Sequence, residues 1–160
     1  MAIKVGDRLP NATFTTMTAD GPKPQSTDDI FKGKKVVLFA VPGAFTPTCH
    51  KNHLPGFVKN ADAIKAKGVD TIAVTGVNDA FVMDAWKRAS SGDAIEFLAD
   101  GSGNWAKAVG LTADLTERGL GVRSQRYCMV IDDGVVTSIS VEDAPGKAEL
   151  SGADNLLKSI

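Results

Sequence analysis

The stretch Lys35-Val36-Val37-Leu38-Phe39-Ala40-Val41 is an unbroken apolar run, and Pro42-Gly43-Ala44-Phe45-Thr46-Pro47-Thr48-Cys49 follows it directly. Such a run predicts a β-strand that is covered on both faces. Thr46 is a good N-cap and Pro47 suits the first helical position, so a helix is expected to begin there. The sequence thus predicts a strand, a short loop and a helix, with Cys49 just beyond the carboxyl end of the strand. Ligands bind at that end in α/β sheets.

Strands and helices alternate on the C-terminal side of this unit. One helix, which has Pro55 in its first turns and ends near Gly68, is predicted by the spacing of Leu54, Phe57, Ala61 and Ile64. Further strands are expected over Thr71–Val77, Ile95–Ala99, Arg126–Asp132 and Val135–Glu142, and further helices over Asp79–Ala89, Asn104–Val109 and Ala153–Ser159. Asp133-Gly134 is a strong signal for a hairpin between the last two strands.

The fold class follows from this order of elements. Strand–helix alternation that ends in a hairpin and a helix predicts an α/β protein with a central mixed sheet and helices on both faces. The lead-in Met1–Thr27 is expected to be irregular or hairpin-like. In the helix over Asp79–Ala89, the residues expected to face inward are Phe81, Val82, Ala85 and Trp86. With no linker or internal repeat, residues 1–160 are predicted to form a single domain.

Composition narrows the function classes. The 160 residues are 43% hydrophobic and carry 18 basic against 19 acidic side chains, so no nucleic-acid or anionic-membrane partner is expected. No apolar run has membrane-spanning length, and the first residues lack the apolar core of a signal peptide. Two cysteines are too few for a disulfide framework. We therefore expect a cytoplasmic protein.

Cys49 is the candidate nucleophile. A thiol at a helix N-terminus is close to unpaired N–H groups and the positive end of the helix dipole, which favour the reactive thiolate. Thr46, three residues earlier, can direct its hydroxyl at the sulfur. Arg126, at the start of a strand, is nominated as the permanent cation that such a thiolate needs. His50 and His53 are expected to be helix-surface or packing groups rather than catalytic bases.

Other interpretations of these residues stay open at this point. Cys49 could be a small core residue, Thr46 only a cap and Arg126 a surface ion-pair residue. A disulfide exchanger would need a second thiol in Cys49-His50-Lys51-Asn52. A metal module could use Cys49, His50, His53 and Cys128, although neighbouring helical residues project about 100° apart. A cysteine hydrolase and a non-catalytic interaction protein are the remaining alternatives.

The motif itself resembles a known family. Pro42-Gly43-Ala44-Phe45-Thr46-Pro47-Thr48-Cys49 is similar to the peroxidatic-cysteine loop of peroxiredoxins, Pro-x-x-x-Thr-x-x-Cys. The segments His53–Phe57, Val77–Val82 and Arg126–Val130 resemble the peroxiredoxin 5 subfamily in particular. The similarity extends over nearly the whole chain.

The resemblance implies a thioredoxin-like fold and a peroxidase that reduces hydrogen peroxide and organic hydroperoxides. It assigns Cys49 as the peroxidatic nucleophile, Thr46 and Arg126 as its polar partners, and Pro42 as the residue that shields the sulfur. It implies no metal and no organic cofactor. It also suggests a homodimer with the pocket near the interface.

One departure from the family concerns the second thiol. Some relatives carry a resolving cysteine in a loop before the last helix, but the stretch Gly146–Gly152 contains none. The other cysteine, Cys128, lies inside an apolar strand and is expected to be inert packing. We therefore expect an external thiol to reduce the enzyme, with glutathione and glutaredoxin favoured over thioredoxin and over a Cys49–Cys128 disulfide.

Overall fold

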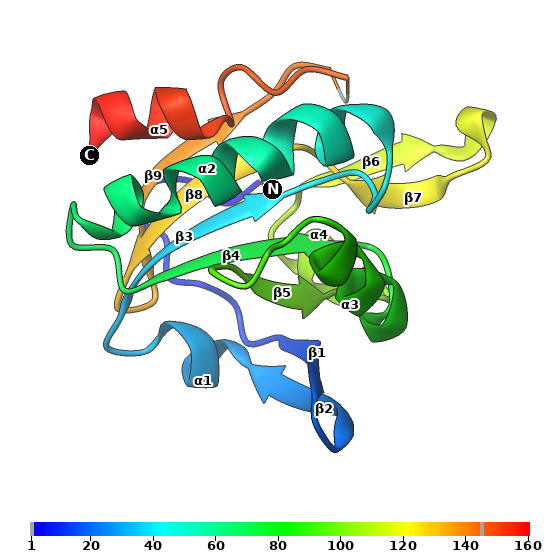
Figure 1. Cartoon of the computed structure of the whole chain (residues 1–160), viewed down its shortest axis with the longest axis horizontal. Helices are drawn as coiled ribbons and strands as arrows, with labels where there is room; N and C mark the ends of the chain where they lie inside the picture. The colour runs from blue at the N-terminus through cyan, green and yellow to red at the C-terminus, as the bar shows by residue number, and fades with distance from the viewer. Residues whose placement is uncertain (1, 145) are drawn as a thin grey trace.

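The computed structural model describes residues 2–144 and 146–160. Its central sheet has seven strands in the order β2-β1-β5-β4-β3-β8-β9 (Figure 1). These strands are β1 (Thr13–Thr18), β2 (Gly21–Ser26), β3 (Lys35–Ala40), β4 (Thr71–Gly76), β5 (Glu96–Ala99), β8 (Tyr127–Asp132) and β9 (Val135–Val141). β4 runs parallel to β3 and β5, and the other neighbouring pairs are antiparallel. The predicted mixed sheet is therefore confirmed.

Helices cover both faces of this sheet, as predicted. They are α1 (Thr27–Phe31), α2 (Leu54–Lys65), α3 (Ala80–Ala89), α4 (Asn104–Ala108) and α5 (Ala153–Ser159). Buried residues of α2, α3 and α5 share one core cluster with Val37 and Phe39, whereas those of α1 and α4 share the other with Val36 and Leu38. Side chains alternate along β3, so its unbroken apolar run serves both cores. Figure 1 shows α2 and α5 side by side over one face of the sheet.

Several local predictions match the structure closely. The four apolar residues that predicted α2 are all buried, and Pro55 lies in its first turn. The helix is followed by a turn that ends at Gly68, where φ is +94°. Asp133 and Gly134 have φ of 48° and 79°, and this pair of positive values is what a two-residue hairpin requires. Arg126 itself lies one residue before β8 rather than inside the strand.

The inward placement of Phe81 was wrong. Its side chain is 66% exposed, and the buried residues of α3 are Ala80, Met83 and Trp86. Val82 and Ala85, which were also expected to face inward, are half-buried, while Trp86 keeps its expected place in the core. The 3.6-residue period alone does not distinguish the expected set from the buried one, because both contain Trp86 at a helical spacing.

Of the two forms expected for the N-terminal lead-in, irregular or hairpin-like, the structure has the hairpin. Within the described part of it, β1 and β2 form a hairpin that joins the sheet beside β5. β2 is an edge strand and contains Pro22 and Pro24. The sequence did not predict the short helix α1 or a separate hairpin of β6 (Thr112–Leu115) and β7 (Gly121–Ser124). In Figure 1 this yellow hairpin projects from the body of the molecule.

Within residues 2–144 and 146–160, no helix combines the length and the apolar character that crossing a bilayer requires.

Candidate active site

The helix that carries Cys49 begins where the sequence predicted. Pro47 and Thr48 are helical, and the carbonyl oxygen of Thr46 accepts the first helical hydrogen bond from the N–H of His50, at 2.8 Å. The next turn, Cys49–His53, is a π-helix: the N–H of Leu54 donates to the carbonyl oxygen of Cys49, five residues back. Such wide turns are rare and often occur at functional sites. No residue pattern in the sequence predicted this one.

The loop before Cys49 is held from two sides. The N–H of Ala44 donates to Oδ1 of Asn78 at 2.9 Å, and Nη1 of Arg123 donates to the carbonyl oxygen of Pro42 at 3.2 Å. Gly43 leaves room for this guanidinium, because a Cβ on it would lie 2.9 Å from the same Nη1. Phe45 has a φ of 65°, an uncommon conformation for a bulky residue. These bonds fix the backbone of the loop, and Pro42 is buried in it at the carboxyl end of β3.

Three of the predicted site residues come together at the sulfur. Cys49 is fully buried, and its Sγ lies 2.9 Å from Oγ1 of Thr46 and 2.9 Å from Nη2 of Arg126. The arginine is only 2% exposed, so it is not the surface ion-pair residue of the alternative interpretation. Charge-assisted hydrogen bonds of this kind stabilise a thiolate.

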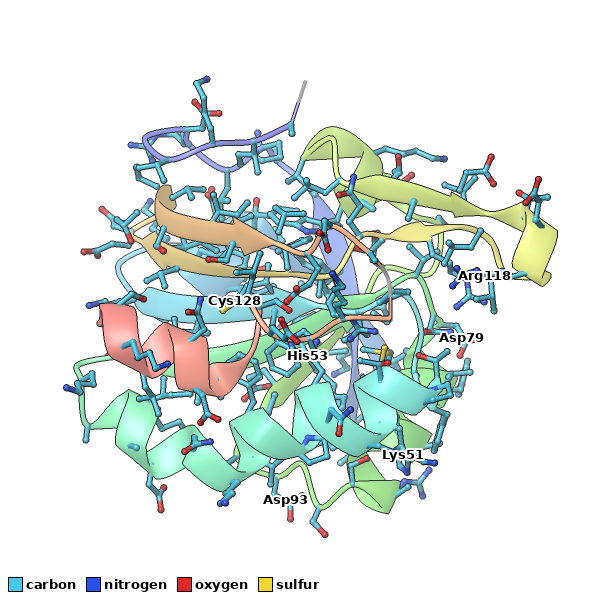
Figure 2. The ribbon with its side chains drawn as sticks, turned by 90° about the horizontal axis from the view of Figure 1, so that it is seen from above. Lys51, His53, Asp79, Asp93, Arg118 and Cys128 are labelled. Carbon is cyan, nitrogen blue, oxygen red and sulfur yellow. The ribbon has the colours of Figure 1, made fainter. Side chains whose placement is uncertain are left out.

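His53 is the site residue whose role the sequence argument missed. It is 1% exposed; its Nδ1 lies 2.9 Å from Nη1 of Arg126, and its Nε2 lies 2.9 Å from the carbonyl oxygen of Ser151. Burial, and then the nearby charge of Arg126, lower the pKa of His53 to about 3. The imidazole is therefore neutral near pH 7. Figure 2 shows His53 well inside the outline of the molecule, unlike Arg118 and Asp93 at its periphery.

A spacing signal for His53 was present in the sequence. Residues four apart on a helix lie on the same face, so this spacing could have placed Cys49 and His53 together. In the sequence, His53 was considered as a base, a packing group and a metal ligand, but not as a group that could orient an arginine.

His50 has a different environment from His53. It is half-buried, its Nδ1 accepts a hydrogen bond from Nε1 of Trp86 at 3.1 Å, and its ring lies 5.6 Å from that of Phe45. The packing role expected for His50 agrees with these contacts. They also connect the turn that holds Cys49 to α3.

Cys128 is buried in the same core cluster as Cys49. Both cysteines are free thiols, but burial raises the pKa of Cys128 to about 12. It packs in the core formed with α2 and α5, so the prediction of inert packing agrees with its position. Among the residues that the structure describes, no three His, Cys, Asp or Glu side chains are grouped as a metal site would require.

Comparisons with known proteins identify the family. The Redoxin family model matches residues 4–157. Peroxiredoxin-2C of Oryza sativa subsp. japonica is 45% identical over 160 residues, which cover 99% of this chain and 98% of that relative. Reduced Prx3 from Vibrio vulnificus in complex with H2O2 has a TM-score of 0.94 at 52% identity, with 98% of each chain covered.

A further solved structure bears on the subfamily. Peroxiredoxin 5 from Alvinella pompejana has a TM-score of 0.84 at 36% identity, and the match covers 98% of this chain and 97% of that one. These similarities confirm the thioredoxin-like fold and the resemblance that the Cys49 loop suggested. The chain belongs to the peroxiredoxins and is a thiol-dependent peroxidase.

Proposed function

We propose that the protein reduces hydrogen peroxide and organic hydroperoxides through a sulfenic acid on Cys49. The observation that carries this proposal is the pair of donors, Thr46 Oγ1 and Arg126 Nη2, that both lie 2.9 Å from the Cys49 sulfur. The thiolate attacks the terminal peroxide oxygen and the O–O bond breaks. The leaving oxygen departs as hydroxide or alkoxide and takes up a proton to form water or an alcohol.

Thr46 and Arg126 act on both oxygens in this proposal. They hold the peroxide in line with the sulfur, and Arg126 balances the charge that moves onto the leaving oxygen. Pro42, buried in the same loop, shields the sulfur from bulk water. His53 is no base here, because Arg126 and Ser151 occupy both of its ring nitrogens.

An external thiol completes the cycle in our proposal. The sulfenic acid condenses with a thiol, water leaves, and a second thiol reduces the mixed disulfide. Gly146–Gly152 contains no cysteine, and the high pKa of Cys128 makes it a poor resolving thiol. We favour glutathione with glutaredoxin as the reductant, with thioredoxin as the second candidate. A reducing cytoplasm is the compartment in which such thiols are abundant.

We also propose a homodimer that forms beside the active-site loop. Phe45 is 46% exposed and belongs to that loop, and Phe81 is 66% exposed at the start of α3. Large exposed aromatic side chains are typical of protein–protein contacts. Dilution monitored by analytical ultracentrifugation tests this part: a Phe81→Ser chain should dissociate at a higher concentration than the parent.

The proposed chemistry is tested by the rate at which reduced protein consumes H2O2, followed by mass spectrometry of the Cys49 peptide. We expect oxidation much faster than that of a free thiol, with one added oxygen that a sulfenic-acid reagent traps. Cys49→Ser should abolish turnover and leave thermal unfolding nearly unchanged. Retained turnover in that variant, or oxidation no faster than that of a free thiol, would refute the mechanism.

A further inference from the structure

A ring of buried hydrogen bonds connects the end of β9 to the active-site arginine. The N–H of Glu142 donates to the carbonyl oxygen of Arg126 at 2.9 Å. The carboxylate of Glu142 accepts from the N–H of Ser151 at 2.5 Å and from its hydroxyl at 2.6 Å. The carbonyl oxygen of Ser151 meets His53 Nε2, and His53 Nδ1 meets Arg126 Nη1. The ring thus begins and ends at Arg126, at its carbonyl oxygen and at its guanidinium.

The two hydrogen bonds of His53 in the ring have only one possible direction. Arginine only donates, so His53 must accept at Nδ1, and its proton must then lie on Nε2 and point at the Ser151 carbonyl. Ser151 donates twice, so it needs the acceptor that Glu142 provides. Glu142 is 7% exposed and Ser151 is fully buried, so in the intact ring these groups satisfy each other instead of bonding to water. A change at one member therefore leaves its neighbour with an unsatisfied group.

Glu142 acts on Arg126 at both ends of the arginine. The main chain of Glu142 is hydrogen-bonded to the main chain of Arg126. Its carboxylate holds Ser151, whose carbonyl oxygen orients the imidazole of His53. The imidazole in turn orients the guanidinium of Arg126. The segment between Glu142 and Ser151 contains no regular helix or strand in its described residues, 143–144 and 146–150. The carboxylate thus joins the end of this segment, at Ser151, to the end of β9.

We propose that Glu142 is a positioning residue for peroxide reduction, acting through Ser151 and His53 to set the place of the Arg126 guanidinium. This inference rests on the role proposed above for Arg126. Catalytic groups that are misplaced by about 1 Å lose up to about 100-fold in rate. Loss of the carboxylate should therefore slow the reaction with peroxide even though Glu142 touches neither the sulfur nor the substrate.

Two substitutions separate positioning from general support of the fold. Glu142→Gln keeps an oxygen that can accept both Ser151 donors, whereas Glu142→Leu keeps the size and removes the acceptor. Leucine is preferred to alanine because Glu142 borders a cavity of about 230 Å³, from which water could replace a truncated side chain. Glu149→Gln and Glu149→Leu are the matched controls, since Glu149 is an exposed carboxylate of the same segment.

Three readouts are needed for each variant. The first is the rate constant for oxidation of reduced Cys49 by H2O2, and the second is its alkylation rate with iodoacetamide, which has no O–O bond for Arg126 to polarise. The third is the NMR resonance of the His53 Nε2–H proton. For Glu142→Leu we expect a more than fivefold slower peroxide reaction, a clearly smaller loss in the alkylation rate, in which Arg126 acts only through the thiolate, and a shifted His53 resonance. Glu142→Gln should stay within fivefold of the parent.

The opposite results overturn the proposal. A peroxide rate within fivefold of the parent in Glu142→Leu, or an unmoved His53 resonance, would show that the ring does not position Arg126. Equal losses in alkylation and in the peroxide reaction would show that Glu142 does not act on the peroxide step. Equal losses in the Gln and Leu variants would show general structural damage. If Glu142→Leu does not fold, Ser151→Ala decides: the His53 resonance should shift and the peroxide rate fall more than twofold, and a smaller change in either would refute the proposal.

Failure of the proposed function can be distinguished from failure of this inference. A parent protein that reacts with peroxide no faster than a free thiol would remove the role of Arg126. The His53 resonance in the Glu142 variants would still report whether the carboxylate controls the imidazole.

Discussion

Thr46 Oγ1 lies 2.9 Å from the sulfur of Cys49 and, at the same time, 2.7 Å from the carbonyl oxygen of Gly43. A hydroxyl has one proton, so it can donate to only one of these two atoms. When Cys49 carries its proton, the S–H can donate to Thr46 while Thr46 donates to Gly43. When the proton has left, the hydroxyl can turn and donate to the thiolate. Thr46 therefore has a partner in both states of the sulfur.

Thr46→Val should slow oxidation by H2O2 by about 100-fold, the usual cost of one donor that stabilises a reacting centre. Thr46→Ser keeps the hydroxyl and should stay within about fivefold of the parent. Stopped-flow oxidation of the reduced protein measures both variants, with thermal unfolding as the control. Equal rates for Val and Ser would contradict the role of the hydroxyl.

Arg126→Lys should be as damaging as a neutral substitution. A guanidinium reaches Cys49 with Nη2 and His53 with Nη1, whereas one ammonium group cannot reproduce this planar fork. We expect a loss of about 100-fold in the peroxide rate constant. Arg118→Lys, at an exposed arginine on the periphery in Figure 2, is the matched control and should change nothing. A fully active Arg126→Lys enzyme would mean that charge alone suffices.

Cys128→Ala should leave peroxide cycling with an external thiol within twofold of the parent. Burial raises the pKa of this thiol to about 12, so it contributes almost no thiolate near pH 7. The truncation should cost about 1 kcal/mol of unfolding free energy, because it leaves a small cavity in the core. Urea unfolding and turnover assays measure the two effects. A Cys49–Cys128 disulfide in oxidised parent protein would contradict this prediction.

The buried His53 should make the folded state sensitive to acid. Its pKa is about 3 in the folded protein against about 6.5 when unfolded, so between these values the unfolded chain binds the proton more tightly. The stability that neutral His53 provides is present above about pH 6.5 and is lost as the pH falls, by up to about 1.4 kcal/mol per pH unit.

Urea unfolding of the parent and of His53→Gln between pH 7 and pH 4.5 measures this effect. Glutamine can accept and donate as the neutral imidazole does, but it does not titrate in this range. The difference in stability between the two proteins should therefore shrink or change sign as the pH falls. Parallel pH profiles would show that His53 does not have the lowered pKa.

The elements that bury apolar residues were predictable from the sequence. β3 and β4 are buried along almost their whole length, α2 buries residues at a helical spacing, and Asp133-Gly134 forces a turn by its backbone preference. The β6–β7 hairpin was not predictable because it pairs outside the central sheet and leaves Val122 51% exposed. The helix α1 is only five residues long, too short for a hydrophobic period to appear.

The main residues of the site were predictable from the sequence, but the hydrogen bonds that connect them to His53 and Ser151 were not. Thr46 and Cys49 share one turn, so their contact follows from local spacing. Arg126 reaches the sulfur across 77 residues of sequence, and only the pairing of β8 with β3 brings it there. The π-turn and the bonds of His53 to Arg126 and Ser151 depend on the packing of three separate segments. No local pattern in the sequence specifies such packing.

The edge strand β2 has a consequence for how copies of the chain can associate. N–H groups of residues two apart point to the same side of a strand, and Pro22 and Pro24 have none to offer. β2 has a single neighbouring strand, so its free side is a poor template for adding a strand from another molecule. Fibrillar sheet extension is therefore disfavoured at this edge. At high protein concentration, aggregation by strand addition at this edge is thus disfavoured. Ordered assembly must use contacts between side chains instead of main-chain pairing at β2.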